Sequence, residues 1–288
     1  MRFLNAEVTR RSLPMDDAIN AMRVAFDEDR ETPDRVLLGK SLFMPGRVRD
    51  LTGIKVVSTV PGGPVGLVAV FDDSGSPLGV VDGPTLTAIR TGAVCGLATD
   101  LMSSPDASTM AMIGAGAMAR DQIHAVRSVR DIQRVVVWSR DMSRATEIAA
   151  ELGIDASGSI DEAMAGADII TTATPSTKPL FSSDVLADTV HVNAIGAFSP
   201  DMVELPASLL DDGFVVVDDI DAAEREAGDL IAAGRTADLD LTELLREVPA
   251  HGPRTIFKSV GIASQDIAAA ATALENAERL DLGVTVGV

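Results

Sequence analysis

Residues 109–119 read TMAMIGAGAMA, and this stretch decides the fold. Its first five residues are predominantly apolar, which is typical of a short strand buried on both faces. Gly114, Gly116 and Ala119 then follow the spacing G-x-G-x-x-A, and a helical pattern occupies 121–129. In such a turn the glycines allow a tight bend and the close approach of a pyrophosphate, and the following helix offers N–H groups to the phosphate. The stretch therefore predicts the start of a dinucleotide-binding βαβ unit.

The same alternation of apolar strands and helices continues toward the C-terminus. A helical pattern occupies 142–152, and the apolar runs are RVVVW (134–138), ADIITTAT (167–174), TVHVNAIG (189–196) and GFVVVDD (213–219). Strands that alternate with helices in this way fold as a doubly wound parallel sheet. We expect an α/β fold with a Rossmann-type domain over 105–262.

The first hundred residues have a different pattern. Apolar residues recur at helical spacing over 15–26, and three valine-rich runs at 36–44, 54–60 and 65–71 read as strands. The turn sequence at 72–75 precedes PLGVVD and indicates a hairpin, so this sheet is expected to be antiparallel. A helix is predicted over 85–102. A last helix over 264–280 has no clear strand after it except 284–288. We therefore predict a smaller α+β domain from residues 1–104, to which the segment 263–288 returns.

Composition excludes several classes of protein. The 24 basic and 43 acidic residues give a net charge of −19, the wrong sign for attraction to nucleic acid or to an anionic membrane. The single cysteine excludes a disulfide framework, and the three histidines lie too far apart for a local metal site. No charge-free apolar stretch reaches the length of a membrane span. We expect a soluble, cytoplasmic protein without a metal.

The end of the second strand of the βαβ unit bears on the choice of cofactor. An NAD-specific site places an acidic residue about 20 residues after the glycines, to bind the ribose hydroxyls. Here Ser139 and Arg140 occupy that place, and Arg144 follows one helical turn later. These groups suit a 2′-phosphate, so NADP(H) is favoured over NAD(H). In the alternative interpretation Asp141 binds the ribose and both arginines are solvated.

Three cations stand beside apolar or small residues in an otherwise acidic chain. Arg35 precedes the first strand run, Lys55 lies within the second, and Arg90 lies in the helix at 85–102. Arginine binds a carboxylate through two parallel hydrogen bonds and lysine binds it as a point charge. The three residues could together bind a carboxylate ligand, or each could pair with one of the many aspartates.

At these residues the sequence resembles the ornithine cyclodeaminase/mu-crystallin family over nearly its whole length. The similar segments, in order, are Lys55 with GLVAVFDDSGSPLGVVDGPTLTAIRTGA, then GAGAMA, TATPS, NAIGAFSPDMVEL and FKSVGIASQD. The resemblance implies a central dinucleotide-binding domain and a substrate-binding and dimerisation domain built from both ends of the chain. It also implies a homodimer that acts on a small imino or amino acid.

The resemblance also assigns roles to individual residues. The substrate carboxylate would be held by Arg35, Lys55 and Arg90, with Lys55 near the reacting imine as the catalytic residue. The residues that match cofactor contacts are Thr91, Gly114, Ala115, Gly116, Ala117, Met118, Ala119, Ser139, Arg140, Arg144, Thr174, Pro175 and Ile195.

One position departs from the cyclodeaminase pattern. Cyclodeaminases carry an aspartate two residues after the glycine of N-A-x-G, whereas Phe198 stands there in this chain. A phenyl ring accepts no proton, so cyclising deamination lacks its acid-base group unless Asp201 replaces it. The sequence favours the ketimine reductase-like branch, with reduction of a cyclic imino acid such as Δ1-pyrroline-2-carboxylate to L-proline. The alternatives are ornithine cyclodeaminase, an alanine-type amino acid dehydrogenase, and a protein that binds NADP and a small carboxylate without chemistry.

Overall fold

The computed structural model describes residues 1–287 and divides the chain into two compact units. One unit combines Met1–Val94 with the segment that starts at Ile262, and the other comprises Cys95–Gly261. The first boundary therefore lies inside helix α3 (Gly83–Met102), whereas the sequence pattern places it at residue 104, after the helix ends. Of the helices in the described part of the chain, none is both long and apolar enough to cross a bilayer.

The first unit contains an eight-stranded sheet with the order β16-β1-β7-β6-β5-β4-β2, in which β3 also pairs with β4. Its described strands are β1 (Arg2–Leu4), β2 (Arg30–Glu31), β3 (Val36–Leu38), β4 (Ser41–Val48), β5 (Leu51–Val60), β6 (Gly63–Phe71), β7 (Pro77–Asp82) and β16 (Val284–Thr285). The pairing is antiparallel, as the hairpin at 72–75 indicates, except that β1 runs parallel to β7. Of the final run 284–288, β16 forms the described strand, and residue 288 lies outside the described residues.

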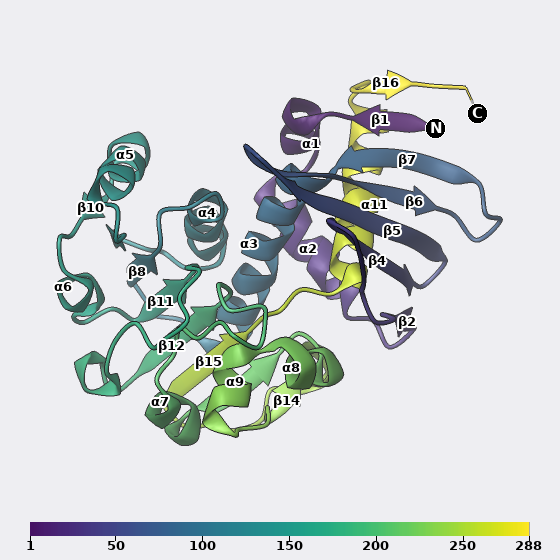
Figure 1. The fold of residues 1–288 in the computed structure, drawn as a ribbon. Helices are drawn as coiled ribbons and strands as arrows, with labels where there is room; N and C mark the ends of the chain where they lie inside the picture. Colours follow the sequence, from purple (N-terminus) through teal and green to yellow (C-terminus); the bar gives the residue numbers. More distant parts are fainter. Residues whose placement is uncertain (288) are drawn as a thin grey trace. The chain divides into compact units, whose positions relative to one another are not determined.

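Helix α11 (Ala263–Arg279) lies across the strands β4 to β7 and also contacts α2 (Met15–Ala25) and α1 (Ala6–Ser12) (Figure 1). Two glycines of the sheet allow it to come close. A Cβ atom on Gly53 would lie 3.0 Å from Ile267, and one on Gly79 would lie 2.3 Å from Leu274. Asn276 of α11 donates to the Ser12 carbonyl at 2.9 Å. The helix is thereby fixed against the sheet with its first turn beside β5.

The second unit is the predicted doubly wound Rossmann-type fold. Its parallel sheet has the order β10-β9-β8-β11-β12-β15-β13-β14. The strands are β8 (Thr109–Ile113), β9 (Arg134–Trp138), β10 (Asp155–Ala156), β11 (Ile169–Thr172), β12 (Val190–Ala194), β13 (Phe214–Val217), β14 (Leu239–Asp240) and β15 (Arg254–Lys258). The helices are α4 (Ala119–Val129), α5 (Met142–Leu152), α6 (Ile160–Met164), α7 (Ala207–Asp212), α8 (Ile220–Glu226), α9 (Gly228–Ala233) and α10 (Leu241–Arg246), with a 3-10 turn η1 (Ser183–Val185). Because β9 and β11 flank β8, the strand order reverses there, and ligands of such sheets bind at that point.

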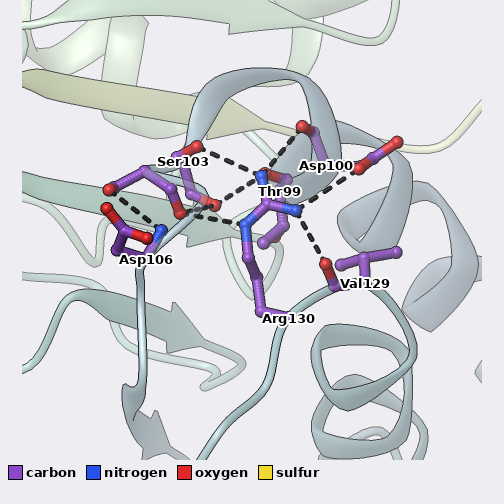
Figure 2. Close-up of polar contacts among 7 residues, drawn as sticks. Thr99, Asp100, Ser103, Asp106, Val129 and Arg130 are labelled. Carbon is purple, nitrogen blue, oxygen red and sulfur yellow. Dashed lines mark hydrogen bonds and ion pairs between the residues drawn. The ribbon is translucent and has the colours of Figure 1, made fainter.

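The C-terminal end of α3 is held within the second unit by Arg130, which follows α4 (Figure 2). Its guanidinium donates to the backbone carbonyls of Thr99, Asp100, Ser103 and Ser104 at 2.9–3.1 Å. The last carbonyls of a helix have no partners within the helix, so one largely buried arginine satisfies several of them at once. This cap fixes the point from which the chain enters β8.

Candidate active site

The glycine turn after β8 leaves space beside its backbone. Gly114 has φ of +118°, and a Cβ there would lie 2.5 Å from the Ala173 carbonyl oxygen, so the fold itself requires this glycine. Gly116 differs, because a Cβ there would meet no protein atom within 4 Å. Packing within the protein therefore does not require glycine at 116. Its position next to the N-terminus of α4 is consistent with a backbone that a ligand's pyrophosphate approaches closely.

A pocket of about 220 Å³, partly open to solvent, lies at the carboxyl ends of β8, β9 and β11. It is lined by Gly114, Ala115, Gly116, Trp138, Ser139, Arg140, Asp141, Arg144, Ala173, Thr174, Pro175, Ser176 and Leu180. Eight of the residues expected to contact the cofactor are thus brought together. Of the others, Ala117 and Met118 lie in the same turn but outside this lining, Ala119 is buried at the start of α4, and Ile195 is buried after β12. Thr91 belongs to the first unit.

The charged side chains of this pocket differ in whether protein contacts already occupy them. Asp141 is the N-cap of α5 and accepts hydrogen bonds from the backbone N–H and hydroxyl of Ser143, which lower the pKa of its carboxyl. Its second oxygen lies 3.4 Å from Nε of Arg144. Arg140 is exposed and has no ion pair or hydrogen bond with the described residues. The acidic group is therefore engaged by the protein, and the cation at the rim is free for a ligand.

A buried carboxylate holds the loops that follow β11 and β12. Glu204 Oε1 accepts from the backbone N–H and the hydroxyl of Thr174 at 2.7 and 2.8 Å. Oε2 accepts from the Thr172 hydroxyl at 3.0 Å and from the Gly196 N–H at 2.7 Å. Burial raises the pKa of Glu204, and Lys258 acts against that rise. Since Thr174 lines the pocket, Glu204 fixes part of the pocket wall.

Lys258 and Asp229 form a second buried pair beneath these loops. Their Nζ and Oδ2 atoms are 3.0 Å apart, and both side chains are fully buried. Asp229 Oδ1 also accepts from the backbone N–H groups of Glu204 and Leu205 at 2.6 and 2.8 Å. The sequence pattern assigns no role to Lys258 or Asp229. Lys258, one of only four lysines and placed at the end of an apolar strand, was the available signal.

In the first unit a carboxylate lies between two of the predicted cations. Asp266, in the first turn of α11, accepts from Nε of Arg90 at 3.0 Å, and its other oxygen lies 2.7 Å from Nζ of Lys55. Arg90 Nη1 donates to Oε1 of Gln265 at 2.7 Å. Lys55 and Arg90 are each 5% exposed. Arg35, half-buried before β3, adds positive charge that acts on Lys55.

These neighbours shift the titration of Lys55 and Asp266. Burial lowers the pKa of Lys55 to about 8, with Arg90 and Arg35 adding to the decrease and Asp266 opposing it. Burial alone raises the pKa of Asp266, but Arg90 and Lys55 together hold it below its ordinary value. At neutral pH Lys55 and Arg90 are therefore both charged beside one carboxylate, that of Asp266.

The position that departs from the cyclodeaminase pattern lies in the loop after β12. Phe198 is 54% exposed there. Asp201 is exposed as well, and its carboxylate accepts from the Ser199 hydroxyl at 2.7 Å. This loop thus carries an apolar ring and an aspartate that already has a partner within the loop.

The fold and the glycine-lined pocket define the class of protein. A Rossmann-type unit with a dinucleotide pocket at its switch point is the cofactor domain of an NAD(P)-dependent oxidoreductase. The ornithine cyclodeaminase/mu-crystallin family matches residues 32–280, and the chain belongs to that family.

Individual relatives agree with this membership. The chain is 33% identical to a ketimine reductase mu-crystallin of Macropus fuliginosus over 76% of its length and 71% of the relative's. It is 34% identical to a Δ1-pyrroline-2-carboxylate reductase of Bacillus cereus (strain ATCC 14579) over 99% of its own length and 98% of the relative's. The structure of the Thermococcus litoralis Δ1-pyrroline-2-carboxylate reductase with NADH and L-proline superposes with a TM-score of 0.91, at 27% identity, covering 99% of this chain and 100% of the other.

Proposed function

We propose that the protein reduces a cyclic imino acid, such as Δ1-pyrroline-2-carboxylate, to the corresponding L-amino acid with NADPH. The observation that carries the proposal is the Lys55–Asp266–Arg90 cluster, in which two buried cations share a single carboxylate. Two cations against one carboxylate leave an excess of positive charge in this cluster, which favours binding of an anionic substrate. The two relatives reported above, a ketimine reductase and a pyrroline-2-carboxylate reductase, support this substrate class.

The geometry of Arg90 limits how a substrate carboxylate binds. Nε and Nη1 already donate to Asp266 and Gln265, and Nη2 has no hydrogen-bond partner among the described residues. A carboxylate is therefore expected at the end of the guanidinium, where Nη2 and the second N–H of Nη1 point, with Lys55 or Arg35 supplying the second contact. The side edge formed by Nε is not available to it.

Lys55 supplies the proton in this proposal. Reduction of a C=N bond adds a hydride to carbon and a proton to nitrogen, and NADPH supplies the hydride when bound. Lys55 is an ammonium below a pKa of about 8, so it donates a proton to the imine nitrogen near neutral pH and regains it from solvent. Arg90 keeps its charge throughout and holds the carboxylate in place.

Arg140 supports the choice of NADPH over NADH. It lies at the pocket rim without a partner in the described chain, and Asp141 is already engaged by Ser143 and Arg144. A free guanidinium suits a 2′-phosphate. The Thermococcus litoralis structure contains NADH, so the two nucleotides must be compared directly.

A homodimer is part of the proposal. Strand β3 pairs with β4 alone and exposes three apolar residues in a row, with Val36 56% and Leu37 and Leu38 each 71% exposed. An exposed apolar strand of this kind is a typical pairing surface. Light scattering of the Leu37→Glu/Leu38→Glu variant tests this: a shift from dimer to monomer supports it, and an unchanged dimer moves the interface elsewhere.

The activity itself is tested by following NADPH oxidation with Δ1-pyrroline-2-carboxylate and with its six-membered analogue. Ornithine with NAD, and pyruvate with ammonia, serve as the competing substrates. Imine reduction without ornithine turnover supports the proposal. Ammonia release from ornithine would show a cyclodeaminase, amination of pyruvate an amino acid dehydrogenase, and binding of NADPH without any turnover a binding protein.

A further inference from the structure

We propose that Asp266 is a positioning residue for the reductase reaction, holding Lys55 and Arg90 as two separate, charged donors. This inference rests on the proposed function for its role in turnover. Its electrostatic part, the effect of Asp266 on the pKa of Lys55, does not depend on that function and can be measured without a substrate.

The contacts divide the carboxylate between the two cations. Oδ2 lies 2.7 Å from Nζ of Lys55, and Oδ1 accepts from Nε of Arg90 at 3.0 Å. Each oxygen therefore serves one donor. Gln265, the preceding residue of α11, takes the next N–H of the guanidinium. Asp266 and Gln265 together orient Arg90 so that its far end is left for a ligand.

The burial of this group makes the arrangement energetically sensitive. Asp266 is fully buried, and the side chains of Lys55 and Arg90 are at most 7% exposed. The charged groups that act on Lys55 come from three elements: Asp266 from α11, Arg90 from α3 and Arg35 from the segment before β3. Without Asp266, the buried cations Lys55 and Arg90 would face each other with little solvent to separate them.

The two neighbours of Lys55 therefore have opposite effects on its charge. Asp266 raises the pKa of Lys55 and Arg90 lowers it, and together with burial, the largest cause, they leave it at about 8. Loss of Asp266 should lower that pKa by about one unit or more, because an opposite charge at this distance typically shifts a pKa by one to three units. Lys55 would then lose its proton near neutral pH. Loss of Arg90 should shift the pKa upward.

A purely structural role for Asp266 makes a different prediction. If its contacts only anchor α11, the Asp266→Asn variant should lose stability while Lys55 titrates as before. Asp17 supplies the matched control, because its carboxylate accepts from Asn276 of α11 at 2.8 Å and has no part in the cluster. The Asp17→Asn variant replaces a charged acceptor that contacts the same helix by a neutral one without touching Lys55.

The experiment is a pH titration of the full-length protein labelled with ¹³C at the lysine ε-carbon. The chain has only four lysines, so four signals are expected, and the Lys55→Met variant identifies the one of interest. We expect the Lys55 midpoint to fall in Asp266→Asn, rise in Arg90→Met and stay unchanged in Asp17→Asn. The alkaline limb of kcat/KM should move in the same direction as each midpoint.

An unchanged Lys55 midpoint in a folded Asp266→Asn protein would overturn the inference. If Asp266→Asn does not fold, Arg90→Met tests the same cluster. A Lys55 pKa that does not rise in this variant would contradict the electrostatic coupling on which the inference rests. Since the titration needs no substrate, shifted midpoints in a protein without imine reductase activity would refute the proposed function alone.

Discussion

Gly196 has no room for a side chain because Glu204 lies against its backbone. The Gly196 N–H donates to Oε2 of Glu204 at 2.7 Å, and a Cβ on Gly196 would lie 2.5 Å from Oε1. The same Cβ would lie 2.3 Å from the Thr174 carbonyl oxygen. One carboxylate thus ties the ends of β11 and β12 together, and it does so next to the cofactor pocket.

Replacing Gly196 by alanine should destabilise the second unit. Backbone atoms cannot give way cheaply, so we expect a loss of about 1–3 kcal/mol in unfolding free energy. Denaturant unfolding measures it. Gly158→Ala is the control, because a Cβ there meets nothing within 4 Å. Equal stability of the two variants would contradict the packing described for Gly196.

Replacing Glu204 by glutamine should cost stability although it preserves shape. The carboxylate accepts from four donors, and an amide nitrogen cannot accept, so buried N–H and O–H groups lose their partners. We expect a loss of about 2–3 kcal/mol and weaker NADPH binding, because Thr174 lines the pocket. Calorimetric unfolding and nucleotide titration check both effects. Unchanged nucleotide binding in a destabilised protein would limit Glu204 to a structural role.

Replacing Arg140 by alanine should discriminate between the two nucleotides. Loss of a charged contact with the 2′-phosphate should raise the KM for NADPH about tenfold or more and leave that for NADH nearly unchanged. Arg134, an exposed arginine at the start of β9 paired with Asp155, provides the control substitution. Equal effects on NADPH and NADH would mean that Arg140 does not contact the 2′-phosphate.

Activity should decline as the pH rises through about 8. The pKa of Lys55 is lowered from its ordinary value of 10.5 to about 8, so its ammonium form is present below that pH and lost above it. Both proton donation and attraction of the carboxylate then weaken, and kcat/KM should fall on the alkaline side. The pH profile of kcat/KM measures this. A profile that stays flat to pH 10 would remove Lys55 from the proton transfer.

The sequence allowed most of the fold to be predicted because its determinants are local. The strand–glycine–helix stretch at 109–119 and the hairpin turn at 72–75 each specify their own structure. The boundary between the two units was harder to predict from the sequence. Helix α3 is buried on nearly every side from Ala88 to Thr99, so its apolar pattern shows no change where one unit ends and the next begins.

The contacts of the site that the sequence did not predict join residues far apart in the chain. Arg90 and Asp266 lie 176 residues apart in sequence and meet only because α11 returns to the first unit. Lys55 and Arg90 are conspicuous in the sequence because each is a cation beside apolar or small residues. Asp266 cannot be distinguished in this way, since it is one of 43 acidic residues in the chain. Residue type and spacing alone do not tell which carboxylate is buried.

The most direct test of the account is the kcat/KM of the wild-type protein and of Lys55→Met with NADPH and Δ1-pyrroline-2-carboxylate. We expect turnover by the wild type and a loss of at least about 10²-fold in the variant, with NADPH binding nearly intact because the nucleotide pocket belongs to the other unit. Retained turnover in Lys55→Met, or no NADPH oxidation by the wild type with any cyclic imino acid, would contradict it.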